Sequence, residues 1–197
     1  MVPDWPSFYE ATKGREPRPL LPRALAAWGD RPAGVAVDLG AGDGTETFAL
    51  LAAGWHVSAV DSSPAAASLM RERVAPAHAA NLEIQTVPIE AAILPAIDLV
   101  YAGYSLPFVP PAAFPATWTR IRGALRPGAI VAANLFGPHD TWADDPTMNF
   151  QDRGAVEGLL DGLDVIDLQE SEEDGSAVTG PKHWHVIEFV ARRPTDG

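Results

Sequence analysis

The chain has 197 residues, no cysteine and a formal net charge of −12. The lack of cysteine excludes disulfides, thiolate metal sites and a cysteine nucleophile, and the negative charge disfavours nucleic acids and anionic membranes as partners. An apolar fraction of 47% is sufficient for one domain with a substantial core. No apolar run approaches the roughly 18 residues of a membrane span, and the N-terminus lacks a signal-peptide pattern, so we expect a cytoplasmic protein.

Strand and helix patterns alternate along most of the chain. Short valine-rich apolar runs predict strands at residues 34–39, 55–60, 82–87, 96–102 and 129–136. Helical patterns with start and stop signals, such as Ser63-Pro64 before a helix, fill the intervals at residues 20–28, 45–53, 64–74, 112–125 and 153–160.

The C-terminal region has a different pattern. Two further strands are expected at residues 165–172 and 183–191, joined by the turn-rich segment 173–181. So short a connection suits an antiparallel hairpin, because parallel strands need a longer crossover. The alternation followed by a hairpin predicts one α/β domain with a mostly parallel sheet and one antiparallel strand.

A glycine-rich turn, Gly40-Ala-Gly42-Asp-Gly44, lies between the first strand and the next helix. Its glycines permit a tight turn and let a ligand approach the backbone, while the following helix offers free N–H groups and a positive dipole end. Asp61, 17 residues after Gly44, ends the second strand and can accept hydrogen bonds from both ribose hydroxyls. The pattern indicates an adenosine-containing ligand and leaves NAD and S-adenosylmethionine both open.

A family resemblance separates these two ligands. Residues 35–45, Val-Ala-Val-Asp-Leu-Gly-Ala-Gly-Asp-Gly-Thr, resemble the first motif of class I S-adenosylmethionine-dependent methyltransferases, whereas dinucleotide dehydrogenases typically carry G-x-G-x-x-G. Residues 96–108 resemble the family's fourth-strand segment. Residues 125–131 resemble its L-x-P-G-G turn, with Ala129 in place of the second glycine. The resemblance implies a Rossmann-like, doubly wound sheet of seven strands in the order 3-2-1-4-5-7-6.

The resemblance also implies which residues contact the methionine and ribose parts of the cofactor. Gly40, Ala41 and Gly42 would face the methionine part, and Asp38 would organise their turn. Asp61 would bind the ribose.

The resemblance also implies which residues contact the adenine and which line the reaction chamber. By the same resemblance Ser62, Ile89 and Glu90 would contact the adenine. Tyr104 and Ser105, just after the fourth strand, would line the chamber, with Tyr104 as a candidate catalytic residue.

An N-terminal segment covers the cofactor in related small methyltransferases. The resemblance therefore implies that residues 1–30 form a helical cap on an α/β core of residues 34–197, the whole chain being one methyltransferase domain. Tyr9 and Arg15 would reach the cofactor from this cap.

Residues for the methyl acceptor are sought beyond the carboxyl ends of the strands. His139, a candidate base or polar wall residue, and Trp142 follow the fifth strand. His183 and His185 share one face of the last strand and are further candidates for substrate contact. The two could also hold a metal, but no third ligand at a suitable spacing is visible, so we predict no metal site.

The predicted function is methyl transfer from S-adenosylmethionine to a small-molecule acceptor by in-line displacement, in a monomer or homodimer. The last strand resembles a tellurite-resistance-like branch of small bacterial methyltransferases. Two alternatives stay open: a non-catalytic protein that binds an S-adenosyl ligand, and an NAD-dependent oxidoreductase. The small size, without an evident extra substrate domain, disfavours a protein acceptor.

Overall fold

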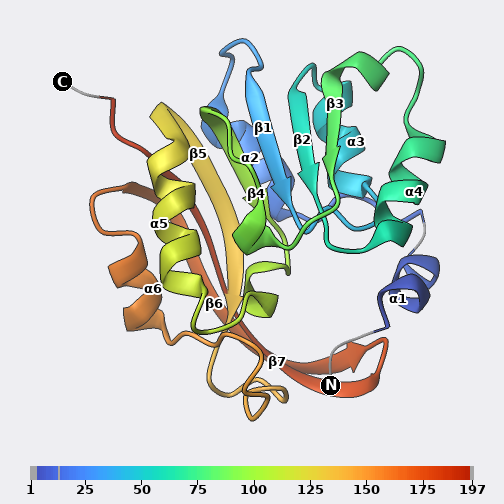
Figure 1. The fold of residues 1–197 in the computed structure, drawn as a ribbon. Coiled ribbons are helices and arrows are strands. Elements are labelled where there is room, and N and C mark those ends of the chain that lie inside the picture. The colour runs from blue at the N-terminus through green and yellow to red at the C-terminus, as the bar shows by residue number, and fades with distance from the viewer. Residues whose placement is uncertain (1–3, 13, 196–197) are drawn as a thin grey trace.

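A seven-stranded sheet organises the computed structural model, which describes residues 4–12 and 14–195 (Figure 1). The strand order is β3-β2-β1-β4-β5-β7-β6. Five strands pair in parallel: β1 (Val35–Leu39), β2 (His56–Val60), β3 (Leu82–Gln85), β4 (Ile97–Ala102) and β5 (Leu125–Phe136). β7 (Gly180–Arg192) pairs antiparallel with β5 and with β6 (Asp164–Ala177). The expected fold class and strand order are confirmed.

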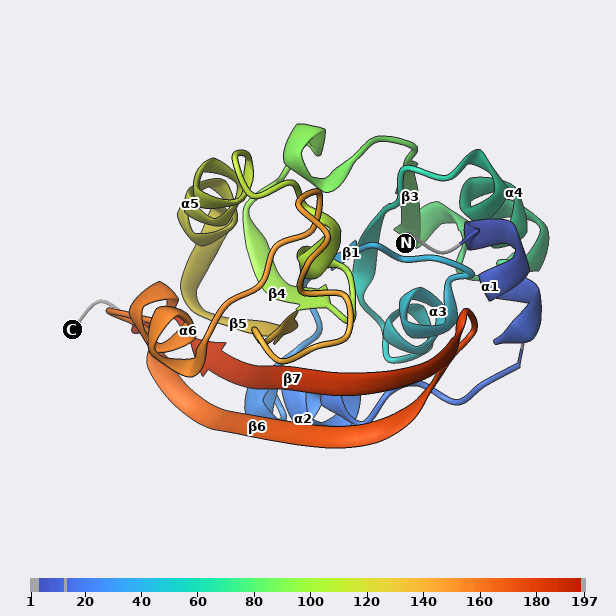
Figure 2. The ribbon, with the colours of Figure 1, turned by 90° about the horizontal axis from the view of Figure 1, so that it is seen from below.

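Helices cover both faces of the sheet (Figures 1 and 2). α2 (Leu20–Trp28) and α3 (Thr45–Ala52) pack on one face, and α5 (Phe114–Ala124) and α6 (Arg153–Leu159) pack on the other. α4 (Pro64–Arg73) packs with α1 (Trp5–Ala11) near β2 and β3. Three short 3₁₀ turns complete the order: η1 (Ala79–Asn81), η2 (Ile89–Ala91) and η3 (Leu106–Phe108).

The segment at residues 173–181, expected to be a turn, belongs instead to a long hairpin. Ala177 of β6 pairs with Gly180 of β7, which leaves Val178 and Thr179 as the connection. The acidic and small residues that suggested a turn lie on an edge strand, where charged, solvent-exposed side chains are common. The hairpin curves so that its tip approaches α1 (Figure 2).

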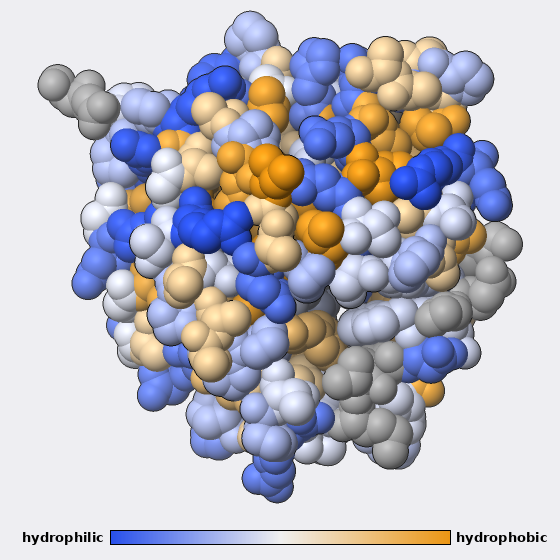
Figure 3. Space-filling view, in the orientation of Figure 1, coloured by the Kyte–Doolittle hydropathy of each residue, from blue (hydrophilic) through white to orange (hydrophobic). Residues whose placement is uncertain are grey.

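The strand centres form the core, with side chains such as Val37, Leu99 and Val131 fully buried. Over the face seen in Figure 3, hydrophobic residues are interspersed with polar and charged ones. Within the described ranges, no helix combines the length and apolar character needed to cross a bilayer.

Candidate active site

The glycine-rich turn after β1 has a backbone that favours glycine. Gly40, Gly42 and Gly44 have φ angles of 76°, 55° and 84°, in the left-handed region. The N–H groups of Gly40 and Ala41 donate to the Val60 carbonyl at 2.8 and 3.0 Å, which ties the turn to the end of β2. A Cβ on Gly40 would lie 2.3 Å from the Cβ of Ser105. The turn is therefore packed closely against the segment that follows β4.

Asp61 lies at the end of β2 beside this turn. Its carboxylate accepts hydrogen bonds from the N–H groups of Gly42 and Ser63, both at 2.8 Å. The Tyr9 hydroxyl on α1 donates to the same carboxylate at 3.4 Å. Burial raises the pKa of Asp61, and these backbone hydrogen bonds oppose the rise. The carboxylate is thus held by the glycine-rich turn and by the segment before α4, and it is contacted by α1.

Asp38 is the buried carboxyl group beneath the turn. Burial, reinforced by the nearby Glu46 carboxylate, raises the pKa of Asp38 from 3.8 to about 7, although the Thr47 hydroxyl donates to it at 2.6 Å. Near neutral pH this group is consequently poised between its neutral and charged forms.

Asp38→Asn should therefore change stability in a pH-dependent way. A folded-state pKa above the unfolded value gives stability that is fully present below about pH 4 and is lost as the pH rises through about 7. We expect the variant and the original protein to unfold alike at pH 4, and the variant to be more stable at pH 8 by at most about 4 kcal/mol. Urea unfolding across this range measures the difference, and a difference independent of pH would contradict it.

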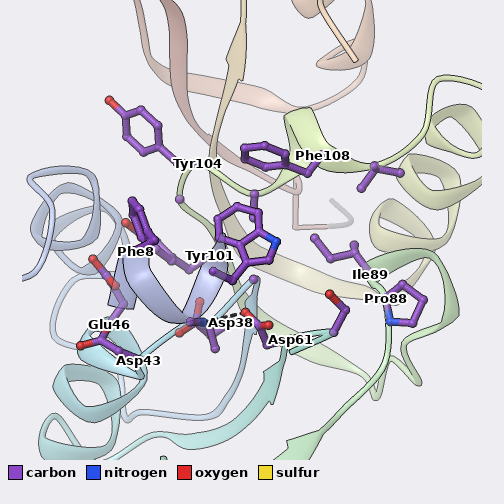
Figure 4. A pocket seen from close by; sticks show the side chains of 18 of the residues that line it. Phe8, Asp38, Asp43, Glu46, Asp61, Pro88, Ile89, Tyr101, Tyr104 and Phe108 are labelled. Atoms are coloured by element: carbon purple, nitrogen blue, oxygen red, sulfur yellow. Dashed lines mark hydrogen bonds between the residues drawn. The ribbon is translucent and has the colours of Figure 1, made fainter. Parts of the chain in front are cut away.

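A cavity of about 360 Å³ opens over the turn, and we call it the glycine-turn cavity. Figure 4 shows Asp38 and Asp61 close together, Pro88 and Ile89 along one side, and Tyr104 and Phe108 across from the carboxylates. The structure brings the residues expected at the cofactor into its lining, namely Tyr9, Arg15, Asp38, Gly40, Ala41, Gly42, Asp61, Ser62, Ile89, Glu90, Tyr104 and Ser105.

Sequence reasoning missed three charged residues of this cavity, Arg18, Asp43 and Glu46. Glu46 is buried, accepts two hydrogen bonds from Arg15 at 2.5 and 2.6 Å, and also accepts the N–H of Arg18. Its place in the first turn of α3, just after the glycines, was the available signal. The Arg18 guanidinium lies 4.2 Å from the Tyr104 ring centroid. Nothing in its proline-flanked segment indicated that contact.

A second cavity, also of about 360 Å³, adjoins the first. We call it the aromatic cavity, because rings from four parts of the chain line it: Trp5, Phe8, Tyr104, Phe108, Phe136, Trp142 and Trp184. Both cavities are bounded by Trp5, Phe8, Arg18, Tyr104 and Phe108. They therefore meet along a shared wall.

Tyr104 stands in that shared wall with an unusual backbone, a φ of 57°. The Tyr104 N–H donates to the Asn134 amide oxygen at 2.5 Å, which fixes the residue to β5. Burial raises the pKa of Tyr104 above its ordinary value of 10.0. At neutral pH the hydroxyl keeps its proton, so it suits a hydrogen-bond donor better than a general base.

The three histidines expected near the acceptor lie outside the residues that line either cavity. His183 and His185 point to the face of β7 opposite Trp184, because side chains alternate along a strand. The loop after β5 runs back along β7, with Gly137 N–H donating to the His185 carbonyl at 2.8 Å. This places His139 outward, 66% exposed, beside Glu172. Trp142, by contrast, lines the aromatic cavity.

Two of these histidines form a cluster with Glu172 that the sequence did not reveal, in which His139 and Glu172 are exposed and His185 is buried. Ligand atoms of His139, Glu172 and His185 lie within 4.8 Å of one another. The backbone N–H of His139 donates to Nδ1 of His185 at 3.2 Å. In neutral His185 the ring proton therefore resides on Nε2, which contacts Glu170 at 2.9 Å. A metal at that nitrogen would have to displace the proton, and the geometry favours a histidine–carboxylate network.

Comparison with known proteins agrees with this geometry. Residues 37–131 match the family model of a methyltransferase domain. Comparison with curated protein sequences gives no significant match.

Solved structures share the fold along nearly the whole chain. A 1,6-didemethyltoxoflavin-N1-methyltransferase of Burkholderia thailandensis, with bound 1,6-didemethyltoxoflavin and S-adenosylhomocysteine, is 23% identical, with 97% of this chain and 85% of that one covered and a TM-score of 0.68. TehB of Haemophilus influenzae is 14% identical, with coverages of 96% and 67% and a TM-score of 0.73. The N-methyltransferase NodS of Bradyrhizobium japonicum, in complex with S-adenosylhomocysteine, is 12% identical, with coverages of 96% and 98% and a TM-score of 0.68.

In its strand order, glycine-rich turn and carboxylate after β2, the chain has a Rossmann-like fold that it shares with these methyltransferase structures. Its matched segment contains the turn and strands β2 to β4 in full. The match to a methyltransferase domain agrees with the motif resemblance, and it covers residues 37–131, just under half of the chain.

Proposed function

We propose that the glycine-turn cavity holds S-adenosylmethionine and that the aromatic cavity holds a small methyl acceptor. The observation that carries this proposal is that the two cavities adjoin and share lining residues. Methyl transfer requires donor and acceptor to meet directly, and adjoining cavities would allow this. The residues Trp5, Phe8, Tyr104 and Phe108 would surround the meeting point and exclude water.

The residues present fit this cofactor. The buried hydroxyls of Tyr101 and Ser105 have no hydrogen-bond partner within the described residues 4–12 and 14–195. Both residues line the glycine-turn cavity, so a polar ligand would satisfy them. Asp61 would accept from the ribose hydroxyls, and Ile89 would pack on the adenine.

The reaction balances without a protein-bound intermediate. A lone pair of the acceptor forms a bond to the methyl carbon, the carbon–sulfur bond breaks, and its electron pair stays on the sulfur of S-adenosylhomocysteine. The sulfonium supplies an already activated methyl group. The protein's part is alignment and exclusion of water, and any acceptor proton passes to solvent or base.

Transfer of a labelled methyl group tests this proposal. The chain would be incubated with labelled S-adenosylmethionine and panels of thiols, amines, phenols and oxyanions. We expect label in at least one small acceptor. Tight cofactor binding with no transfer to any class would favour the non-catalytic alternative.

Asp61→Ala should weaken S-adenosylhomocysteine binding by about 1–3 kcal/mol, because charge-assisted hydrogen bonds to the ribose would be lost. Calorimetry measures the affinity, and thermal unfolding reports whether loss of the Gly42 and Ser63 contacts destabilises the fold. Asp161→Ala, at an exposed position outside the cavity lining, is the matched control. Unchanged affinity in Asp61→Ala would remove this carboxylate from the ribose site.

We also propose that the whole chain is one methyltransferase domain capped by α1. Supporting this, α1 packs with α4 and contributes Tyr9 to the glycine-turn cavity. The expected cap of residues 1–30 on a core of residues 34–197 needs one correction, because α2 (Leu20–Trp28) packs its buried side chains on the sheet and so belongs to the core. Residence in the cytoplasm, a monomeric or homodimeric state, and the lack of nucleic-acid, membrane and metal partners stay predictions.

A further inference from the structure

The aromatic cavity carries information about the acceptor itself. Rings from α1, from the segment after β4, from β5 with its following loop, and from β7 converge on it. Aromatic rings attract one another edge to face or in offset stacks, and each such contact adds stability beyond the area buried. A cavity lined this way therefore favours an occupant with its own aromatic ring.

The rings hold each other in fixed orientations. Tyr104 meets Trp184 edge to face, with centroids 5.9 Å apart and an interplanar angle of 87°. Phe136 meets Trp184 at 5.7 Å and 69°, and Phe108 meets Trp142 at 6.3 Å and 55°. Such a wall presents both ring faces and ring edges before any ligand arrives, which reduces the ordering cost of binding.

A buried ion pair lies against the tryptophan rings of the aromatic cavity. The Lys182 ammonium is 4.0 Å from the Trp142 centroid and 4.2 Å from that of Trp184, and it pairs with the Asp140 carboxylate. The two side chains are 1% and 0% exposed. The two tryptophans thus already make cation–π contacts with a cation of the protein, and Asp140 neutralises that cation.

Charge in the lining is balanced as well. Among the described residues of the aromatic cavity, Arg18 and Glu173 are charged, one of each sign. Three hydroxyl-bearing residues of the hairpin also line the cavity: Ser176 and Thr179 at its tip, and Ser171 in the middle of β6. The cavity therefore matches an uncharged occupant with a few hydrogen-bonding substituents.

We propose that the methyl acceptor is an uncharged planar aromatic or heteroaromatic molecule, bound among these rings with its nucleophilic atom toward Tyr104 and Phe108. This inference rests on the proposed function, because it assigns the acceptor side of the same reaction. The cavity of about 360 Å³ lies in the lower part of the range for small-ligand sites, about 300–1,000 Å³. The bound ring would sit at the wall shared with the donor.

Matched probes test the aromatic requirement. With the protein saturated by S-adenosylhomocysteine, calorimetry would compare 2-naphthol with decahydro-2-naphthol, which has the same substituent on a saturated frame, and with choline as a cation. We expect 2-naphthol to bind about tenfold more tightly than the saturated compound. Equal or tighter binding of decahydro-2-naphthol, or preferential binding of choline, would overturn the proposal.

Variants assign the preference to this cavity. Trp184→Leu and Trp142→Leu should each reduce the ratio of the two affinities to about threefold or less, with S-adenosylhomocysteine binding retained. Trp28→Leu is the matched control, since Trp28 packs on Trp55 and Arg31 away from both cavities. An unchanged ratio in both folded tryptophan variants would contradict the assignment. Failure of S-adenosylhomocysteine itself to bind would instead refute the proposed function, and this inference with it.

Discussion

Gly40→Ala is expected to weaken S-adenosylhomocysteine binding by roughly 100-fold, a loss of about 2.7 kcal/mol. The added Cβ would lie 2.3 Å from the Ser105 Cβ, so the turn would have to move away from the segment after β4. The φ of 76° adds strain of about 1–2 kcal/mol for a residue with a side chain. Calorimetry would measure affinity and urea unfolding would measure stability.

Gly162→Ala is the matched control for backbone strain. Gly162 has a φ of 77°, but its added Cβ would meet only the end of the Arg122 side chain, at 3.6 Å. This variant should lose stability and retain affinity for S-adenosylhomocysteine. Equal affinity in the two folded variants would show that the cofactor does not use the glycine-rich turn.

Asp140→Ala is expected to lower the free energy of unfolding by about 3–5 kcal/mol, because a buried Lys182 ammonium would lose its partner. Asp140 also accepts the N–H of Trp142 at 3.0 Å, so the variant releases the loop after β5 as well. Urea unfolding, followed by tryptophan fluorescence, measures the change.

Two further variants separate charge from packing. The double variant Asp140→Asn with Lys182→Met removes both charges and should recover much of the lost stability. Glu157→Ala breaks the exposed ion pair with Arg153 and should cost no more than about 0.5 kcal/mol. A change below about 1 kcal/mol in Asp140→Ala would contradict the role given to the buried pair.

The grouping of residues around the glycine-turn cavity was predictable from local sequence. Gly40, Gly42 and Asp61 follow consecutive strands of a parallel sheet, and the carboxyl ends of such strands meet at one edge. The spacing of these residues therefore determined their proximity without knowledge of the rest of the fold.

The lining of the aromatic cavity depends on long-range packing that spacing does not encode. Trp142 and His139 are close in sequence, yet the loop pairs with β7 so that Trp142 faces the aromatic cavity and His139 faces solvent. The strand periodicity correctly placed His183 and His185 on one face, but it could not say which face meets the cavity. Glu172 lies beside His185 only because the register of β6 and β7 pairs these two residues, and the sequence did not predict that register.

The most direct test of the central claim is calorimetric titration of the chain with S-adenosylhomocysteine and, separately, with NADH. Both ligands contain adenosine, so Asp61 and the glycine-rich turn could serve either. We predict that S-adenosylhomocysteine binds with one-to-one stoichiometry and that NADH does not bind measurably. Tight NADH binding without binding of S-adenosylhomocysteine would contradict the assignment of the glycine-turn cavity.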